Sequence, residues 1–158
     1  MKVITLLPVK NEAWILPYTL ENFSQFSDHI IVADQHSTDG SLEIYKRFPK
    51  VLVFNNDFSG HSNKIRWDLL KEARKIPGNN LIICLDADEL LSPKAVEIMR
   101  QSASEEAVSF HADWIQLIED GLRHRVDGVW KENFKDFAFV DDRSSVQYNQ
   151  EELLIDHT

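Results

Sequence analysis

The feature that most constrains the fold is an alternation of short apolar runs with longer amphipathic segments over the first two-thirds of the chain. Four apolar runs predict strands, at Val3–Leu7, Ile30–Ala33, Val51–Phe54 and Leu81–Leu85. Four amphipathic segments predict helices, at Ala13–Phe26, Ser41–Phe48, His61–Lys75 and from Ser92 to about Arg100. Strands and helices that alternate with short links indicate an α/β domain with a mostly parallel sheet and helices on both faces.

The C-terminal third departs from this rhythm. After about Glu106, the segments "AVSFHADWIQLI" and "LRHRV" flank a short turn at residues 119–121 that contains Gly121. Two apolar segments joined by such a turn predict an antiparallel hairpin. We interpret this hairpin as a small appendage on the sheet, so that residues 1–158 form a single domain. The stretch from Asp141 to Thr158 is polar and gives no structural prediction.

Composition excludes several classes of protein. A chain of 158 residues with 43% apolar content can bury one sizeable core. Seventeen basic against twenty-six acidic side chains give a net charge of −9, which disfavours nucleic acids and anionic membranes as partners. The single cysteine, Cys84, lies inside an apolar run, so we expect a buried, inert thiol and a cytoplasmic protein. No run has transmembrane length, so we expect any membrane contact to be peripheral.

Polar clusters follow three of the predicted strands. They are "PVKNE" after the first strand, "DQHSTDG" after the second and "DADE" after the fourth. Ligands of open parallel sheets bind beyond the carboxyl ends of the strands. We therefore expect the three clusters to meet in one cleft.

Asp86 and Asp88 in the "DADE" cluster have the spacing of metal ligands. Side chains two apart in extended backbone point the same way, and hard carboxylate oxygens suit Mg²⁺ or Mn²⁺ shared with substrate phosphates. A purely electrostatic role at the next helix is the alternative, but Ser92 already provides the N-cap and lies too far from both acids. A calcium-binding loop of the EF-hand type is disfavoured because Leu91 stands where that loop needs glycine.

Asp34 ends the second predicted strand, where a carboxylate can accept hydrogen bonds from a ribose hydroxyl or a base amide. The following Ser37, Thr38, Asp39 and Gly40 supply oxygens that can cap the next helix. For Thr38 and Asp39 an ordinary capping role is at least as good an interpretation as a ligand contact.

Taken together, "LLPVKNEAWILPYTLENF", "IIVADQHSTDGS" and "IICLDADEL" resemble the family 2 glycosyltransferases, enzymes of the GT-A fold that use nucleotide-sugar donors. The three elements occur in the family's order from about residue 3 to residue 100. The resemblance implies a GT-A-like, Rossmann-like sheet. It also implies that Pro8, Asn11 and Glu12 line the nucleotide pocket and that Asp34 contacts the base and ribose.

The same resemblance assigns the remaining donor-site residues. Asp86 would lie near the ribose, and Asp88 would ligate the Mn²⁺ or Mg²⁺ ion that bridges the donor diphosphate, with Asp86 as a second candidate ligand. Arg66 matches the arginine of the family's Arg-Asn pair. The chain departs from the family at Trp67, which replaces the asparagine, and at Gln35 and His36, which replace a common Asp-Gly.

The implied reaction is displacement at an anomeric carbon, in which a carboxylate takes the proton of the acceptor hydroxyl. In the family this base lies well downstream of the Asp-x-Asp. The acids available there are Asp136, Asp141 and Asp142, and we select Asp142 and Asp141 as candidates. His157 is a further candidate, as a metal ligand.

We therefore expect residues 1–104 to bind a UDP- or GDP-type sugar donor and residues 105–158 to form an acceptor-side segment for a saccharide or other hydroxyl acceptor. The chain is short for a complete enzyme of this kind. One alternative is an inactive nucleotide-sugar-binding protein on the same scaffold. Another is an interaction module that docks through the aromatic segment "VWKENFKDFAFV". A haloacid-dehalogenase-like phosphatase is disfavoured, because its Asp-x-Asp belongs on the first strand.

Overall fold

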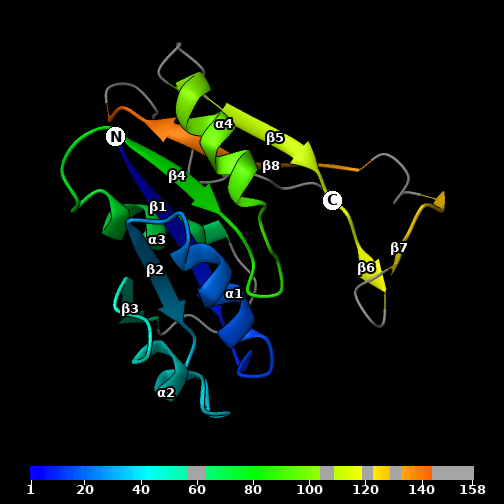
Figure 1. The fold of residues 1–158 in the computed structure, drawn as a ribbon. Coiled ribbons are helices and arrows are strands. Elements are labelled where there is room, and N and C mark those ends of the chain that lie inside the picture. Colours follow the sequence, from blue (N-terminus) through cyan, green and yellow to red (C-terminus); the bar gives the residue numbers. More distant parts are fainter. Residues whose placement is uncertain (57–62, 104–108, 119–122, 129–132, 144–158) are drawn as a thin grey trace.

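A computed structural model describes residues 1–56, 63–103, 109–118, 123–128 and 133–143 of the chain. A six-stranded sheet forms its centre, in the order β3-β2-β1-β4-β8-β5, and β6 and β7 form a separate two-stranded sheet (Figure 1). The strands are β1 (Lys2–Val9), β2 (His29–Asp34), β3 (Val51–Asn55), β4 (Asn80–Cys84), β5 (Ser109–Asp113), β6 (Leu117–Ile118), β7 (Arg123–His124) and β8 (Phe134–Asp141). The helices are α1 (Leu16–Ser24), α2 (Ser41–Tyr45), α3 (Asn63–Ala73) and α4 (Pro93–Ala103).

The parallel part of the sheet consists of β3, β2, β1 and β4, and it confirms the four predicted strands. Each of β1, β2 and β4 carries apolar side chains on both faces. In β4, for example, Leu81 and Ile83 belong to one buried cluster and Ile82 and Cys84 to another. A strand that is covered on both faces has a continuous run of apolar residues, and this run allowed these strands to be predicted from the sequence.

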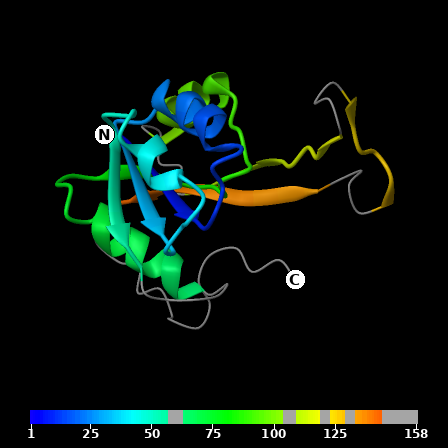
Figure 2. The same ribbon diagram turned by 90° about the horizontal axis from the view of Figure 1, so that it is seen from below.

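Helices cover both faces of the sheet. Buried residues of α1, α2 and α4 join the cluster on one face, whereas Ile65, Leu69, Leu70 and Ala73 of α3 pack on the other. Figure 2 shows the sheet nearly edge-on, with α1 and α4 on one side and α3 on the opposite side. The predicted α/β class with a mostly parallel sheet is confirmed.

The first helix begins three residues later than predicted. Regular helix starts at Leu16 and not at Ala13, with Pro17 in the first turn, where its missing N–H costs nothing. The carbonyl of Glu12 accepts hydrogen bonds from the amides of Ile15 and Leu16, so residues 12–15 form a separate turn. This turn leads the chain from the end of β1 into α1.

The predicted antiparallel hairpin in the C-terminal third is confirmed as β6 and β7, but it is shorter than predicted. The segment around Ser109–Asp113 becomes β5, which pairs antiparallel with β8 inside the main sheet, and β8 in turn pairs antiparallel with β4. Only β6 and β7 form the hairpin, with two residues in each strand, and its predicted turn lies outside the described residues. The hairpin projects away from the body of the molecule (Figures 1 and 2).

Strand β8 contains a β-bulge that reorients its first half. Phe110 lies opposite Ala138, but the next residue, His111, lies opposite Asp136, so Phe137 is an extra residue in β8. Directly opposite residues of an antiparallel pair share a face. Lys135 therefore lies opposite Ala112, which packs against the α1–α4 core. Without the bulge, Asp136 would occupy that position.

Candidate functional site

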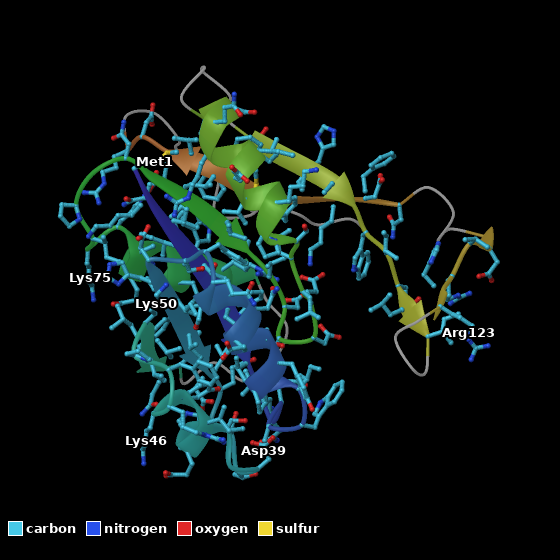
Figure 3. The ribbon with its side chains drawn as sticks, in the orientation of Figure 1. Met1, Asp39, Lys46, Lys50, Lys75 and Arg123 are labelled. Atoms are coloured by element: carbon cyan, nitrogen blue, oxygen red, sulfur yellow. The ribbon has the colours of Figure 1, made fainter. Side chains whose placement is uncertain are left out.

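Three polar loops follow the carboxyl ends of β1, β2 and β4, as the sequence predicts. These strands are adjacent and parallel, so their loops emerge at one edge of the sheet. Figure 3 shows Asp39, from the loop after β2, at this edge, and Met1 and Lys75 toward the opposite edge. The loop after β3 falls largely outside the described residues.

The loops after β1 and β2 are tied together by reciprocal hydrogen bonds. Asn11 donates its amide N–H to Ser37 Oγ at 3.0 Å, and its Oδ1 accepts the amide N–H of Thr38 at 2.8 Å. Asp39 Oδ2 accepts the amide N–H of Ala13 at 2.7 Å. Asn11 has a φ of 57°, a left-handed conformation that asparagine adopts more readily than most residues. Asn11, Thr38 and Asp39 thus shape the loops in this structure.

Asp34 is buried beneath these loops. Its Oδ1 accepts the amide N–H of Ser37 at 2.9 Å, and its Oδ2 accepts the hydroxyl of Tyr45 at 2.9 Å. Burial, together with the nearby Asp34 carboxylate, raises the pKa of Tyr45 far above its usual value. Tyr45 therefore keeps its proton and donates a hydrogen bond to Asp34. Asp34 is 1% exposed, and each of its two oxygens keeps a lone pair beyond the hydrogen bond that it accepts.

The "DADE" cluster forms a turn, residues 86–89, that is closed on itself. Glu89 donates its amide N–H to the carbonyl of Asp86 at 3.1 Å, and Glu89 Oε2 accepts the amide N–H of Asp86 at 2.8 Å. The second bond, from a glutamate side chain to the amide three residues earlier, is one half of a capping box, and the first is a backbone turn bond. The Asp-x-x-Glu spacing was the sequence signal for it, although we assigned Glu89 no role.

Two cationic side chains bind this turn from different elements. Arg66 of α3 donates from Nη2 to Asp86 Oδ1 at 2.6 Å. Lys135 of β8 donates from Nζ to both oxygens of Glu89, at 2.6 and 2.7 Å, and lies 3.3 Å from Asp86 Oδ2. Burial alone would raise the pKa of Asp86, but the charges of Arg66 and Lys135 outweigh it and hold that pKa below its usual value. Asp86 is therefore ionised at neutral pH.

Sequence reasoning missed Lys135. Its side chain is 15% exposed, and its ammonium lies 5.5 Å from the centre of the Trp114 ring, within the range of a cation–π contact. Nothing in the local sequence distinguishes it from other lysines, because its place in the site depends on the pairing of β8 with β4 and on the bulge in β8.

Helix α1 fixes the other side of the turn. Thr19 donates its hydroxyl to the carbonyl of Ala87 at 2.6 Å. The side chain of Asn22 donates to the carbonyl of Leu91 and accepts the amide N–H of Leu91, both at 3.0 Å. The segment from residue 85 to residue 91 is therefore anchored by α1, α3 and β8 together.

Asp88 differs from its neighbours. It is exposed, and it makes no hydrogen bond or ion pair with any other residue that the structure describes. Among the described residues, no three His, Cys, Asp or Glu side chains form a metal-binding group. Mg²⁺ usually needs only one or two carboxylates because substrate phosphates and water complete its shell. Asp88, with a remaining lone pair of Asp86, fits such a site.

The other predicted donor-site residues lie at the same edge. Pro8 is close to the carboxyl end of β1, and Glu12 accepts the indole N–H of Trp14 at 2.9 Å. Arg66 reaches the turn from α3, as described above. The structure thus brings Pro8, Asn11, Glu12, Asp34, Arg66, Asp86 and Asp88 to one edge of the sheet.

Asp141, which we selected as a candidate base, lies apart from the other candidate residues. Asp141 lies opposite Asn80, at the amino end of β4, and so at the edge of the sheet away from Asp86. It is 2% exposed and accepts two hydrogen bonds from Arg74, at 2.9 and 2.7 Å. Asp142 follows it at the same edge. We selected Asp141 because the family's base lies well downstream of the Asp-x-Asp. Because β8 runs antiparallel to β4, however, the C-terminal end of β8 lies at the edge of the sheet opposite the Asp-x-Asp. His157 and Trp130 lie outside the described residues.

Comparison with known proteins supplies independent evidence on this chain. A model of "Glycosyl transferase family 2" matches residues 5–150. No curated protein matches the chain. None of the helices among the described residues is long and apolar enough to cross a membrane.

Several solved structures share the fold. One is TarS of S. aureus, at 20% identity and a TM-score of 0.59 over 69% of this chain and 21% of that chain. A second is TarS 1–349 in complex with UDP-GlcNAc, at 22% identity and a TM-score of 0.56 over 84% of this chain and 39% of that one. A third is 4-diphosphocytidyl-2C-methyl-D-erythritol synthase, at 15% identity and a TM-score of 0.59 over 88% and 73%. This chain thus spans about a fifth of the length of TarS.

Proposed function

The chain belongs to glycosyl transferase family 2, and we propose from that premise that it transfers a sugar from a nucleoside-diphosphate donor to a hydroxyl acceptor with the help of a divalent cation. The observation that carries this proposal is that the Asp86–Glu89 turn and the Asp34 loop emerge at the same edge of a parallel sheet, on either side of β1. A diphosphate and a nucleoside can occupy these two places at once.

The charges around the turn support a metal-assisted reaction. The turn carries three carboxylates, Asp86, Asp88 and Glu89, and the two cations beside it, Arg66 and Lys135, already form ion pairs with Asp86 and Glu89. A donor diphosphate would add further negative charge to a site that already carries a net negative charge. A divalent cation that arrives with the diphosphate removes this repulsion.

Asp88 would hold the metal ion, with Asp86 as the second ligand. When bound, Mg²⁺ or Mn²⁺ would stabilise the negative charge that develops on the departing diphosphate. Arg66 and Glu89 hold Asp86 and the turn in place. In the transfer itself, the acceptor oxygen forms a bond to the anomeric carbon, the bond from that carbon to the diphosphate oxygen breaks, and a base takes the acceptor's proton.

The loops after β1 and β2 would bind the nucleoside. Asp34 keeps lone pairs for hydrogen bonds from a base or ribose, and Asn11 and Ser37 hold the loop above it. TarS was solved with UDP-GlcNAc and with UDP, so uridine is the first nucleotide to test on this chain. The acceptor that we propose is a saccharide or another hydroxyl compound.

Release of nucleoside diphosphate from a panel of UDP- and GDP-sugars, with Mn²⁺ and with EDTA, tests the proposal. We expect release from at least one donor in Mn²⁺ and none in EDTA. Asp88→Asn should lower the rate by about a hundredfold or more, because it removes the charge that holds the metal. Asp127→Asn, which alters an exposed carboxylate on the hairpin side of the molecule, should leave the rate unchanged.

Two results would overturn the proposal in different ways. Metal-dependent binding of UDP without release from any donor would indicate a nucleotide-sugar-binding protein that lacks turnover. If the protein neither binds UDP nor releases nucleoside diphosphate under any metal condition, it shares only its fold with the active transferases. That result would favour an interaction module.

A further inference from the structure

Lys135 lies where a cation would be expected to bind. Its ammonium contacts both oxygens of Glu89 and lies 3.3 Å from Asp86 Oδ2, so it bridges two of the three carboxylates of the turn. It comes from β8, which the proposed donor-binding segment does not include, and the bulge at Phe137 directs it toward the turn. The described structure thus supplies this carboxylate cluster with a cation of its own.

The surroundings keep the ammonium in place. Glu89 is 9% exposed, and an unpaired carboxylate buried to that extent is costly, so Lys135 and Glu89 stabilise each other. The face of Trp114 covers the ammonium from another side. Arg66 holds the opposite oxygen of Asp86. The lysine therefore has defined contacts, unlike a mobile surface side chain.

A lysine in this position must weaken the binding of a free metal ion. Without it, the Asp86 oxygen that faces the ammonium would be open to a divalent ion, with the exposed Asp88 two residues away, and Mg²⁺ needs only one or two carboxylates. With it, the ammonium offsets one negative charge and lies against both Asp86 and Glu89, and a divalent ion that enters meets its repulsion. A diphosphate restores the balance, because its negative charges attract both the metal ion and the lysine.

We propose that Lys135 is a built-in counter-cation of the Asp86–Glu89 turn, so that a divalent metal ion binds there together with a nucleoside diphosphate and not ahead of it. Lys135 is in this sense a positioning residue, which acts through the carboxylates. The inference rests on the proposed function for the identity of the diphosphate, but its statement about the metal ion alone concerns only residues of this chain.

The test is a titration of the nucleotide-free protein with Mn²⁺, in which electron paramagnetic resonance measures the concentration of unbound Mn²⁺ at each step. Lys135→Met should bind Mn²⁺ at least about tenfold more tightly than the unaltered chain, since it removes a repulsive charge and the contact that occupies Asp86 Oδ2. Lys135→Arg keeps the charge and should bind as weakly as the unaltered chain. Lys71→Met removes an exposed lysine of α3 and is the matched control for net charge.

A residue that only supports the fold would not raise metal affinity when it is replaced. The inference is therefore overturned if Lys135→Met binds Mn²⁺ no more tightly than Lys71→Met. If Lys135→Met does not fold, the double variant Lys135→Met/Glu89→Gln removes both charges of the buried pair. It should bind Mn²⁺ more tightly than the unaltered chain, and equal affinity would also contradict the inference.

A second titration separates this inference from the proposed function. In the unaltered chain, UDP should raise the affinity for Mn²⁺ at least tenfold, and in Lys135→Met this gain should shrink. If UDP has no effect on the unaltered chain while Lys135→Met still gains Mn²⁺ affinity, the donor proposal fails and the counter-cation role stands. If UDP acts as expected but Lys135→Met behaves like Lys71→Met, the counter-cation role fails and the donor proposal stands.

Discussion

Cys84 is the residue whose chemistry is most directly determined by its surroundings. It is the last residue of β4, it is buried, and it packs with the apolar side chains on the α3 face. Burial raises the pKa of its thiol to about 11. The thiolate is the reactive form, so at pH 8 about one molecule in a thousand carries it.

We predict that Cys84 does not react with a thiol reagent such as DTNB at pH 8 while the protein is folded. Reaction should become complete once urea unfolds the chain, when the thiol regains its ordinary pKa. Absorbance of the released chromophore measures both. Rapid reaction in the absence of urea would show that the α3 face opens easily.

Asp141 provides a second test at the residue scale. Its carboxylate is buried and held by two hydrogen bonds from Arg74, so Asp141→Asn should leave a partly buried guanidinium without its counter-charge. We expect a loss of about 3 kcal/mol in the free energy of unfolding, measured by urea denaturation. Release of nucleoside diphosphate by the folded variant should be unchanged. A stable variant with abolished release would restore Asp141 as a candidate base.

At the scale of elements, helix α1 is the support of the proposed metal-binding turn. Asn22 forms two hydrogen bonds with the backbone of Leu91, and Thr19 forms one with that of Ala87. The apolar face of α1, with Leu16, Leu20 and Phe23, is buried independently of these polar contacts.

Replacement of Asn22 by alanine should therefore loosen the turn while α1 stays folded. We expect the free energy of unfolding to fall by about 1 to 2 kcal/mol, because two hydrogen bonds are lost. Hydrogen exchange at the Leu91 amide should quicken by more than exchange at amides in the middle of β4. Equal acceleration throughout the domain would mean that Asn22 contributes to global stability only.

Elements differ in how far the sequence predicted them. The parallel strands and their helices were predictable because each strand is apolar on both faces and each helix has an apolar stripe. Strand β8 was not, because charged Lys135 and Asp136 interrupt its apolar pattern and the bulge at Phe137 breaks its alternation. The segment of β5 was recognised as extended, but a local turn signal could not reveal that its partner is the distant segment Phe134–Asp141.

The same distinction applies to the candidate site. The residues at the carboxyl ends of β1, β2 and β4 were predictable, because a parallel sheet brings these ends together. Lys135 was not, because it enters the site through long-range pairing of β8 with β4. The location of Asp141 and Asp142 at the other edge of the sheet was not predictable for the same reason, since the direction of β8 determines which of its ends meets the site.

At the scale of the whole molecule, the contacts of the proposed donor site extend beyond the N-terminal two-thirds of the chain. The main sheet crosses the expected boundary at residue 104, and β8 lies between β4 and β5. Lys135 brings a charge from this later segment to the turn at residues 86–89. The division into a donor-binding half and an acceptor-side segment therefore stays a prediction about function and does not describe separate structural units.

Calorimetric titration of UDP into the full chain, once with Mn²⁺ and once with EDTA, tests the central claim most directly. We predict that UDP binds the unaltered chain with micromolar affinity in Mn²⁺ and at least tenfold more weakly in EDTA. Asp88→Asn should lose this effect of the metal ion, and Asp127→Asn should keep it. GDP in place of UDP tests the choice of base. Binding that is equal in Mn²⁺ and EDTA, or absent with both nucleotides, would contradict a metal-assisted nucleotide-sugar site at this edge of the sheet.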